Sequence, residues 1–177
     1  MHVNTKKMAV MGVLAAFAVL LLVFSSVIET NSLFLITAAA FCIGIVIREW
    51  GIASGAVFLA GSFLLGMIVA PNRLYCLTFL MMGIYLLLSE VLWGKIADAK
   101  NIRRRTAVLW AGRYVIFNCL FLPVLFLFPS LLFGEKAADT LFLFALIGGE
   151  AALFVFEKAY VYFQVFVWGK LRGKLKI

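Results

Sequence analysis

Five ionisable side chains interrupt otherwise apolar stretches of this sequence, and they are the first candidates for chemistry. They are Glu90, Arg113, Glu150, Glu157 and Lys158. A charged group in apolar surroundings is costly, so such groups either pair with one another or mark a site that binds a proton, an ion or a ligand. Residues for soluble-enzyme chemistry are scarce, because the only histidine is His2 and no CxxC, HExxH, GxSxG, Walker lysine or GxGxxG motif is present. We therefore expect a protein that is not an enzyme and needs no metal or cofactor.

Three polar residues of the last apolar stretch share one helical face. Glu150, Glu157 and Gln164 follow one another at intervals of seven. At about 100 degrees per residue they fall within about 40 degrees of one another around a helix. We expect this polar stripe to face the interior of the protein.

The elements that carry these groups are long apolar helices. The chain has 177 residues, of which 66% are hydrophobic and 14% charged, whereas soluble domains are about 45 to 50% apolar and about 25% charged. The apolar runs are continuous and lack the alternation of barrel strands. The three cysteines, Cys42, Cys76 and Cys119, are widely spaced, and we expect them to be small core residues without a disulfide framework. The sequence thus predicts an all-α, polytopic membrane protein.

Six stretches are predicted to cross the membrane, forming one transmembrane domain over residues 1–177. Each is an apolar run comparable in length with the hydrocarbon core of a bilayer. They are residues 8–28, 32–47, 51–70, 74–93, 106–128 and 140–168. The last run is long enough to tilt strongly or to protrude.

The distribution of basic residues predicts the sidedness. With the N-terminus in the cytoplasm, twelve basic residues lie inside: Lys6, Lys7, Arg48, Lys95, Lys100, Arg103, Arg104, Arg105, Lys170, Arg172, Lys174 and Lys176. Two, Arg73 and Lys136, lie outside. Such asymmetry is typical of the positive-inside rule and places both termini in the cytoplasm of a cell-membrane protein. It also explains the net charge of +8 without a nucleic-acid partner.

Four of the five buried ionisable residues are expected in the cytoplasmic half of the membrane. They are Glu90, Arg113, Glu157 and Lys158. One interpretation is a structural ion-pair network, in which Arg113 meets Glu90 or Glu157 and pins the last three helices. A proton or cation relay is the alternative, and substrate contact is a third.

Glu150 is expected near the middle of the membrane, roughly 15 Å from the outer end of its helix. Gly148 and Gly149 precede it and permit close helix approach or local unwinding. We predict Glu150, Asn118 and Gly149 as a substrate-binding set. The alternative is a neutral acid hydrogen-bonded to another helix, with Asn118 as the possible partner.

Two segments resemble a known family of membrane proteins. Residues 5–16 (TKKMAVMGVLAA) combine basic residues with an alanine-rich first helix, and residues 47–56 (IREWGIASGA) form a short inner turn before a small-residue helix. Together with six spans and both ends inside, they resemble the substrate-binding (S) components of energy-coupling factor (ECF) transporters and related six-helix bacterial proteins. The resemblance covers about the first hundred residues.

The resemblance implies a function and partners. By it, Gly12 and Ala16 would form a smooth face on the first helix that packs against a transmembrane coupling subunit driven by cytoplasmic ATPases. The leading hypothesis is a subunit that binds a small, vitamin-like organic nutrient within the membrane, between the fourth, fifth and sixth predicted helices, and hands it to the coupling subunit. The alternative is a non-transporting scaffold in envelope or cell-shape assembly, whose basic segments 95–105 and 170–176 recruit cytoplasmic proteins or anionic lipid.

Overall fold

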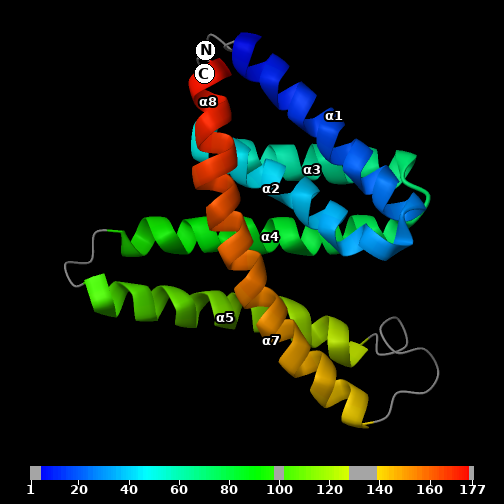
Figure 1. The fold of residues 1–177 in the computed structure, drawn as a ribbon, viewed down its shortest axis with the longest axis vertical. Coiled ribbons are helices and arrows are strands. Elements are labelled where there is room, and N and C mark those ends of the chain that lie inside the picture. Colours follow the sequence, from blue (N-terminus) through cyan, green and yellow to red (C-terminus); the bar gives the residue numbers. More distant parts are fainter. Residues whose placement is uncertain (1–4, 98–101, 128–138, 176–177) are drawn as a thin grey trace. The chain divides into compact units, whose positions relative to one another are not determined.

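The structure is a computed structural model that describes residues 5–97, 102–127 and 139–175, and in these ranges it contains helices and no strand. The elements in chain order are α1 (Thr5–Val27), the 3-10 turn η1 (Glu29–Asn31), α2 (Ser32–Trp50), α3 (Ile52–Val69), α4 (Arg73–Ile96), α5 (Ile102–Leu127), α7 (Asp139–Tyr162), η2 (Phe163–Trp168) and α8 (Gly169–Leu175) (Figure 1). The all-α prediction is therefore confirmed, and the predicted helix ends lie within a few residues of the observed ones. Lys100, Lys136 and Lys176, used above to assign sidedness, lie outside the described residues.

Five of these helices, α1 to α5, are long and apolar enough to cross a membrane. This supports a multi-pass membrane protein. The last stretch carries Glu150, Glu157 and Lys158 close together and is not among these five. Its crossing of the membrane and the cytoplasmic location of the termini stay predictions.

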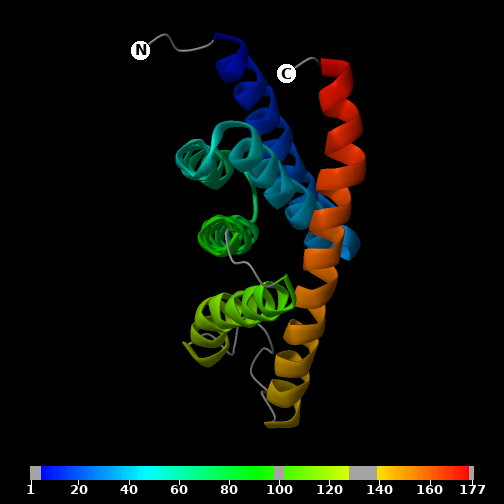
Figure 2. The ribbon, with the colours of Figure 1, turned by 90° about the vertical axis from the view of Figure 1, so that its left-hand side faces the viewer.

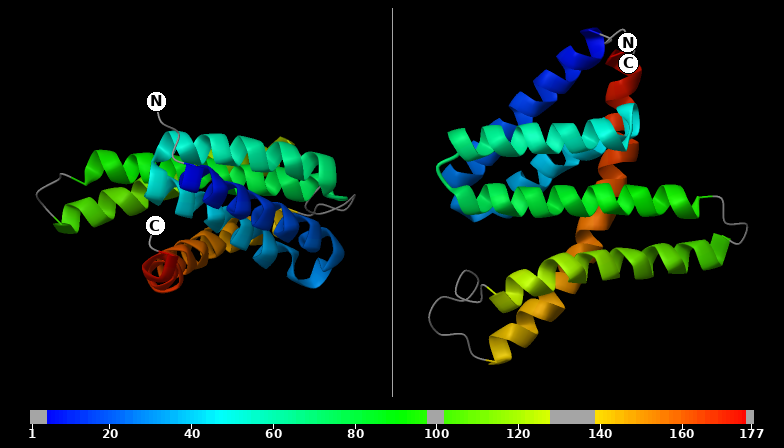
Figure 3. Two further views of the ribbon diagram at one scale, coloured as in Figure 1. Left: turned by 90° about the horizontal axis from the view of Figure 1, so that it is seen from above. Right: turned by 180° about the vertical axis from the view of Figure 1, so that it is seen from behind.

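The chain divides into two compact units, Met1–Glu90 and Val91–Ile177, and each is described here by itself. The prediction of one domain stays a prediction. In the first unit α1 packs on α2 and α3, which also contact each other; Figure 3 shows α1 crossing both obliquely. Ten residues of α2 are buried, including the continuous run from Ala39 to Ile47, which makes α2 the central helix of this unit.

Glycines allow close helix packing in the first unit. A Cβ atom at Gly83 of α4 would lie 2.5 Å from a Leu59 methyl carbon and 2.8 Å from Ile43 Cδ1. A Cβ atom at Gly55 of α3 would likewise collide with the Ile47 side chain. Between helices in lipid, where hydrophobicity drives association weakly, small residues let neighbouring side chains and backbones pack closely.

The turn between α2 and α3 depends on Gly51, whose φ is +86°. A side chain would strain this left-handed conformation, which glycine adopts freely. The Gly51 N–H still donates to the Ile47 carbonyl at 2.8 Å, so it caps α2 while the chain reverses. Lys7 Nζ donates to Ser54 Oγ at 2.9 Å and ties the start of α1 to the start of α3.

In the second unit α5 packs against α7. From α7 the helix continues through η2, a π-helical segment, into α8 (Figure 2). α5 contains Pro123 within its helical range. Near the start of α5, a Cβ atom at Gly112 would collide with the Leu92 side chain of α4.

Candidate functional site

The α5 and α7 helices are joined by an ion pair between Arg113 and Glu157. Arg113 Nη1 lies 2.9 Å from Glu157 Oε2, and the two side chains are 17% and 2% exposed. Breaking a buried ion pair by removing one partner is strongly destabilising. The pair is therefore a structural link between these two helices.

Aromatic rings support both cations of this region. The Arg113 guanidinium lies 5.8 Å from the centre of the Trp110 ring, and Lys158 Nζ lies 5.4 Å from the centre of the Phe154 ring. The Trp110 and Phe154 rings stack across the helix interface, with their centroids 5.5 Å apart. Cation–π contacts stabilise positive charge, so the Trp110 ring adds to the pairing of Arg113 with Glu157, whereas Lys158 is exposed.

A second polar link joins Asn118 of α5 to Glu150 of α7. Asn118 Nδ2 donates to Glu150 Oε1 at 2.7 Å and to the Tyr114 carbonyl at 2.9 Å. Both amide hydrogens are thus used, which fixes the orientation of the Asn118 side chain. The other carboxylate oxygen, Glu150 Oε2, is buried and has no hydrogen-bond partner among the described residues.

Gly149 sets the distance between the helices beside this link. A Cβ atom at Gly149 would lie 3.0 Å from Phe121 Cε1 and 3.6 Å from Phe117 Cζ. The Phe117 and Phe121 rings stack on each other with centroids 5.1 Å apart. A ring can therefore lie directly against the α7 backbone only because residue 149 has no side chain. A Cβ at the adjacent Gly148 would meet nothing within 4 Å.

Helical periodicity explains how these contacts arise. Residues three or four apart lie on one face of a helix, so Tyr114, Asn118 and Leu122 form one row along α5. Arg113 meets Glu157, whereas Asn118, further along α5, meets the earlier Glu150. The two helices therefore run antiparallel, and their polar pairs are separated by aromatic contacts.

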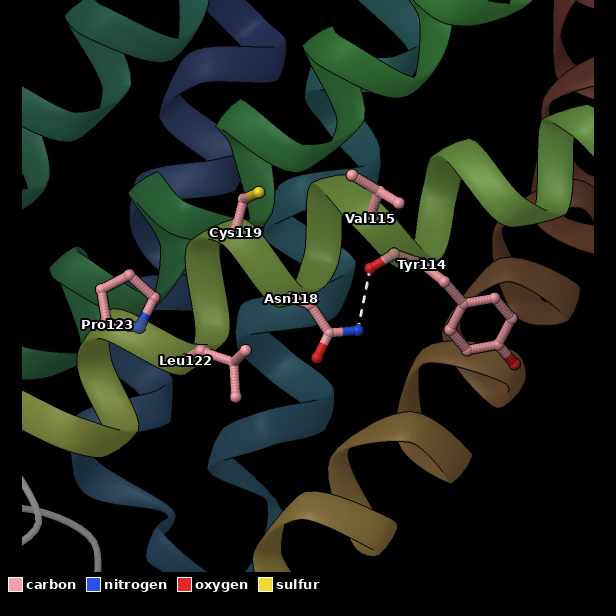
Figure 4. A pocket seen from close by; sticks show the side chains of 6 residues that line it. All are labelled: Tyr114, Val115, Asn118, Cys119, Leu122 and Pro123. Atoms are coloured by element: carbon pink, nitrogen blue, oxygen red, sulfur yellow. Dashed lines mark hydrogen bonds between the residues drawn. The ribbon is translucent and has the colours of Figure 1, made fainter.

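An open hollow of about 540 Å³ lies along α5. It is lined by Tyr114, Val115, Asn118, Cys119, Leu122 and Pro123 (Figure 4). Asn118 is common to the hollow and to the link with α7.

The structure corrects the expectation that all three cysteines are core residues. Cys42 and Cys76 are buried, but Cys119 is exposed.

Glu90 has a partner that the sequence analysis did not assign. Its Oε1 lies 3.5 Å from Arg48 Nε, which joins the end of α2 to α4 in the first unit. Arg48 was assigned to an inner turn, yet α2 extends through Trp50 and carries Arg48 within the helix. The signal in the sequence was that Arg48 and Glu90 were both expected near the cytoplasmic ends of their helices.

The stripe of Glu150, Glu157 and Gln164 is largely buried. Glu157 and Gln164 are 1% and 4% exposed, and Glu150 is half-buried. Gln164 lies in the π-helical η2, and neither its amide nitrogen nor its amide oxygen has a partner among the described residues. Among all the residues that the structure describes, no group of three or more His, Cys, Asp or Glu side chains is placed so that it could hold a metal ion.

Gly12 and Ala16 lie on an exposed part of α1. Both residues are exposed, and a Cβ atom at Gly12 would meet nothing within 4 Å. Val13, Phe17 and Leu20 are exposed on the same helix. Much of the α1 surface is therefore available to lipid or to another membrane protein.

Comparison of the chain with protein family models, with characterised proteins and with solved structures finds no match. The resemblance to ECF substrate-binding components stays an expectation, and the function is argued below from the site itself.

Proposed function

We propose that this chain is the substrate-capture subunit of an ECF-type importer, binding a small organic nutrient between α5 and α7. The observation that supports the proposal is the Asn118–Glu150 hydrogen bond, which holds a carboxyl group between two apolar helices, while Asn118 also lines an open hollow. Polar groups that converge in an apolar, concave setting are typical of ligand sites. An ionisable residue on a membrane-embedded helix is a candidate for function.

Capture without chemistry by this subunit implies that other subunits supply the energy. In the proposal, α7 makes the sixth crossing and both termini lie in the cytoplasm. The exposed surface of α1 around Gly12 and Ala16 offers a smooth face to a coupling subunit, which two cytoplasmic ATPases would drive. Small residues on a helix allow such close approach.

The test is ligand-dependent thermal stabilisation of the purified chain, screened with vitamins and nucleobases. At least one compound should raise the unfolding temperature, because a ligand that binds the folded state alone stabilises it by mass action. The shift should be lost in Glu150→Gln and Asn118→Ala and kept in Glu49→Gln, a control that removes one carboxylate from the end of α2. The full chain should also copurify with an ATPase-coupled membrane subunit from its native cells.

The proposal fails if no compound stabilises the protein and no ATPase-coupled subunit copurifies. Capture of cell-envelope proteins instead, abolished by neutralising Arg103, Arg104 and Arg105, would identify the chain as the scaffold considered above.

A further inference from the structure

We propose that an anionic phospholipid binds this chain at the start of α5, with its phosphate on Arg105 and one acyl chain along the exposed apolar face of the same helix. This site is separate from the Asn118–Glu150 link, and it does not depend on the proposed importer function. Three features carry the proposal: the contacts that hold Arg105, the charges near it, and the apolar surface that follows it along α5.

Two contacts hold the Arg105 guanidinium next to the end of α4. It lies 5.2 Å from the centre of the Trp93 ring, and its Nη1 donates to the Ala97 carbonyl at 3.3 Å. Trp93 is 41% exposed, and indole rings are typical of the interface between membrane and water. Arg105 is also the first residue of an apolar span that runs to Phe126. The guanidinium is therefore fixed at the level expected for lipid headgroups.

Arg105 has hydrogen-bond donors available for an anion. Arg48 and Arg113 pair with Glu90 and Glu157, but Arg105 pairs with no carboxylate among the residues that the structure describes. A guanidinium has five N–H donors, and its hydrogen bond to the neutral Ala97 carbonyl uses one of them. A phosphate group suits the others, because its oxygens accept paired hydrogen bonds from the planar guanidinium.

The sequence around Arg105 adds positive charge and little negative charge. Residues 95–105 contain five basic residues, and Asp98 is their one acidic residue. Lys95, in the last turn of α4, is exposed, and the first turn of α5 has no acidic residue. Basic clusters beside the inner leaflet attract anionic lipid. The site therefore favours a phospholipid with net negative charge over a zwitterionic one.

An exposed apolar face of α5 continues from Arg105 into the span. Val108 and Val115 are 47% and 62% exposed, and at about 100 degrees per residue both lie within about 80 degrees of Arg105 around the helix. Val115 also lines the hollow along α5. It follows Arg105 by about 15 Å along the helix axis, which is half the thickness of the hydrocarbon core. One acyl chain of the same leaflet can cover this face, so a lipid fits better than a soluble phosphate.

The experiment measures binding of phosphatidylglycerol to the purified full chain by native mass spectrometry in a neutral detergent. Phosphatidylcholine with identical acyl chains is the comparison lipid, and the native chain should bind it more weakly. Arg105→Gln should weaken the binding of phosphatidylglycerol about tenfold, the order expected when charge-assisted hydrogen bonds to a phosphate are lost.

Two further variants separate the site from general charge attraction. Lys170→Gln, the matched control, removes one exposed basic residue of α8 and should weaken binding clearly less than Arg105→Gln. Arg105→Lys keeps the charge but loses the paired geometry, so its affinity should lie between those of the native chain and Arg105→Gln. It also keeps the test valid if Arg105→Gln fails to fold.

Equal affinity of the native chain for the two lipids would overturn the proposal. Equal losses in Arg105→Gln and Lys170→Gln, or native affinity in Arg105→Lys, would overturn it too, because charge alone would then explain the binding. Release of phosphatidylglycerol by an equal concentration of inorganic phosphate would show that the site takes a soluble anion instead of a lipid.

Discussion

Gly149 allows α5 and α7 to meet closely at the level of Glu150, and its neighbour Gly148 provides a matched control. Gly149→Val should lower the free energy of unfolding by about 1 to 3 kcal/mol, the usual cost of overpacking, because Phe121 occupies the space a side chain needs. Gly148→Val, which faces open space, should cost clearly less. Thermal unfolding of both variants in detergent checks this, and equal losses would contradict the packing at Gly149.

The Arg113–Glu157 pair makes a second prediction for single residues. Arg113→Gln or Glu157→Gln alone should each cost about 3 to 5 kcal/mol, because each change breaks a buried ion pair and leaves the other charge in place. The double variant should cost less than the two single losses combined, with a coupling energy of about 1 to 3 kcal/mol. Reversible unfolding in mixed micelles measures the cycle. Simple additivity would show that the two side chains do not interact.

At the scale of elements, α5 combines a structural role with an exposed, proline-containing face. Proline within a helix removes one backbone hydrogen bond and is tolerated in membranes when other groups satisfy the freed carbonyl. At Pro123 the helix therefore lacks one backbone hydrogen bond, and this residue lines the hollow about one turn from Asn118.

Pro123→Ala should restore the missing donor to the Cys119 carbonyl. We expect a higher unfolding temperature, because the alanine N–H completes the hydrogen bond that proline omits from the helix. Val124→Ala, at the next position, is the control and should leave the donor pattern unchanged. If Pro123→Ala leaves the unfolding temperature as in the native chain, the Cys119 carbonyl is already satisfied by another donor.

At the scale of the whole molecule, the prediction concerns which side of the membrane each connection occupies. Alkaline phosphatase fused after Lys136 should be active, since that enzyme requires the outer side, and green fluorescent protein fused to the C-terminus should fluoresce. The excess of basic residues on one side is the physical reason. Both reporters placed after Lys100 serve as the control and should indicate the cytoplasm. Fluorescence from a fusion after Lys136 would contradict this sidedness and with it the proposed importer subunit, and the same side reported after Lys136 and at the C-terminus would exclude a crossing by α7.

The helices and their approximate ends were predictable from the sequence. Long apolar runs in lipid satisfy their backbone hydrogen bonds only as helices, so hydropathy alone located α1 to α5 and the start of α7. The ends shifted where polar residues extended a helix: α2 runs through Arg48 to Trp50 rather than stopping at residue 47. A hydropathy pattern cannot distinguish a charged last turn from a loop.

The candidate site was only partly predictable. The sequence identified Glu150, Asn118 and Arg113 as costly groups, because a polar or charged side chain within an apolar run needs a partner or a function. It left Arg113 with two possible partners and gave Glu90 no link to Arg48. Which groups meet depends on helix rotation and on the approach that glycines permit, and both are set by packing between helices.

By itself, the sequence determined that this chain is helical, that several of its helices can cross a membrane, and that few charged residues lie within them. Composition and the length of apolar runs are local properties of the chain, so they can be read without the tertiary structure. Only the tertiary structure decided that Arg113 forms its ion pair with Glu157, that Asn118 donates a hydrogen bond to one oxygen of Glu150, and that Phe121 lies against Gly149. Those choices follow from the geometry of two packed helices, which brings together residues 28 to 44 positions apart.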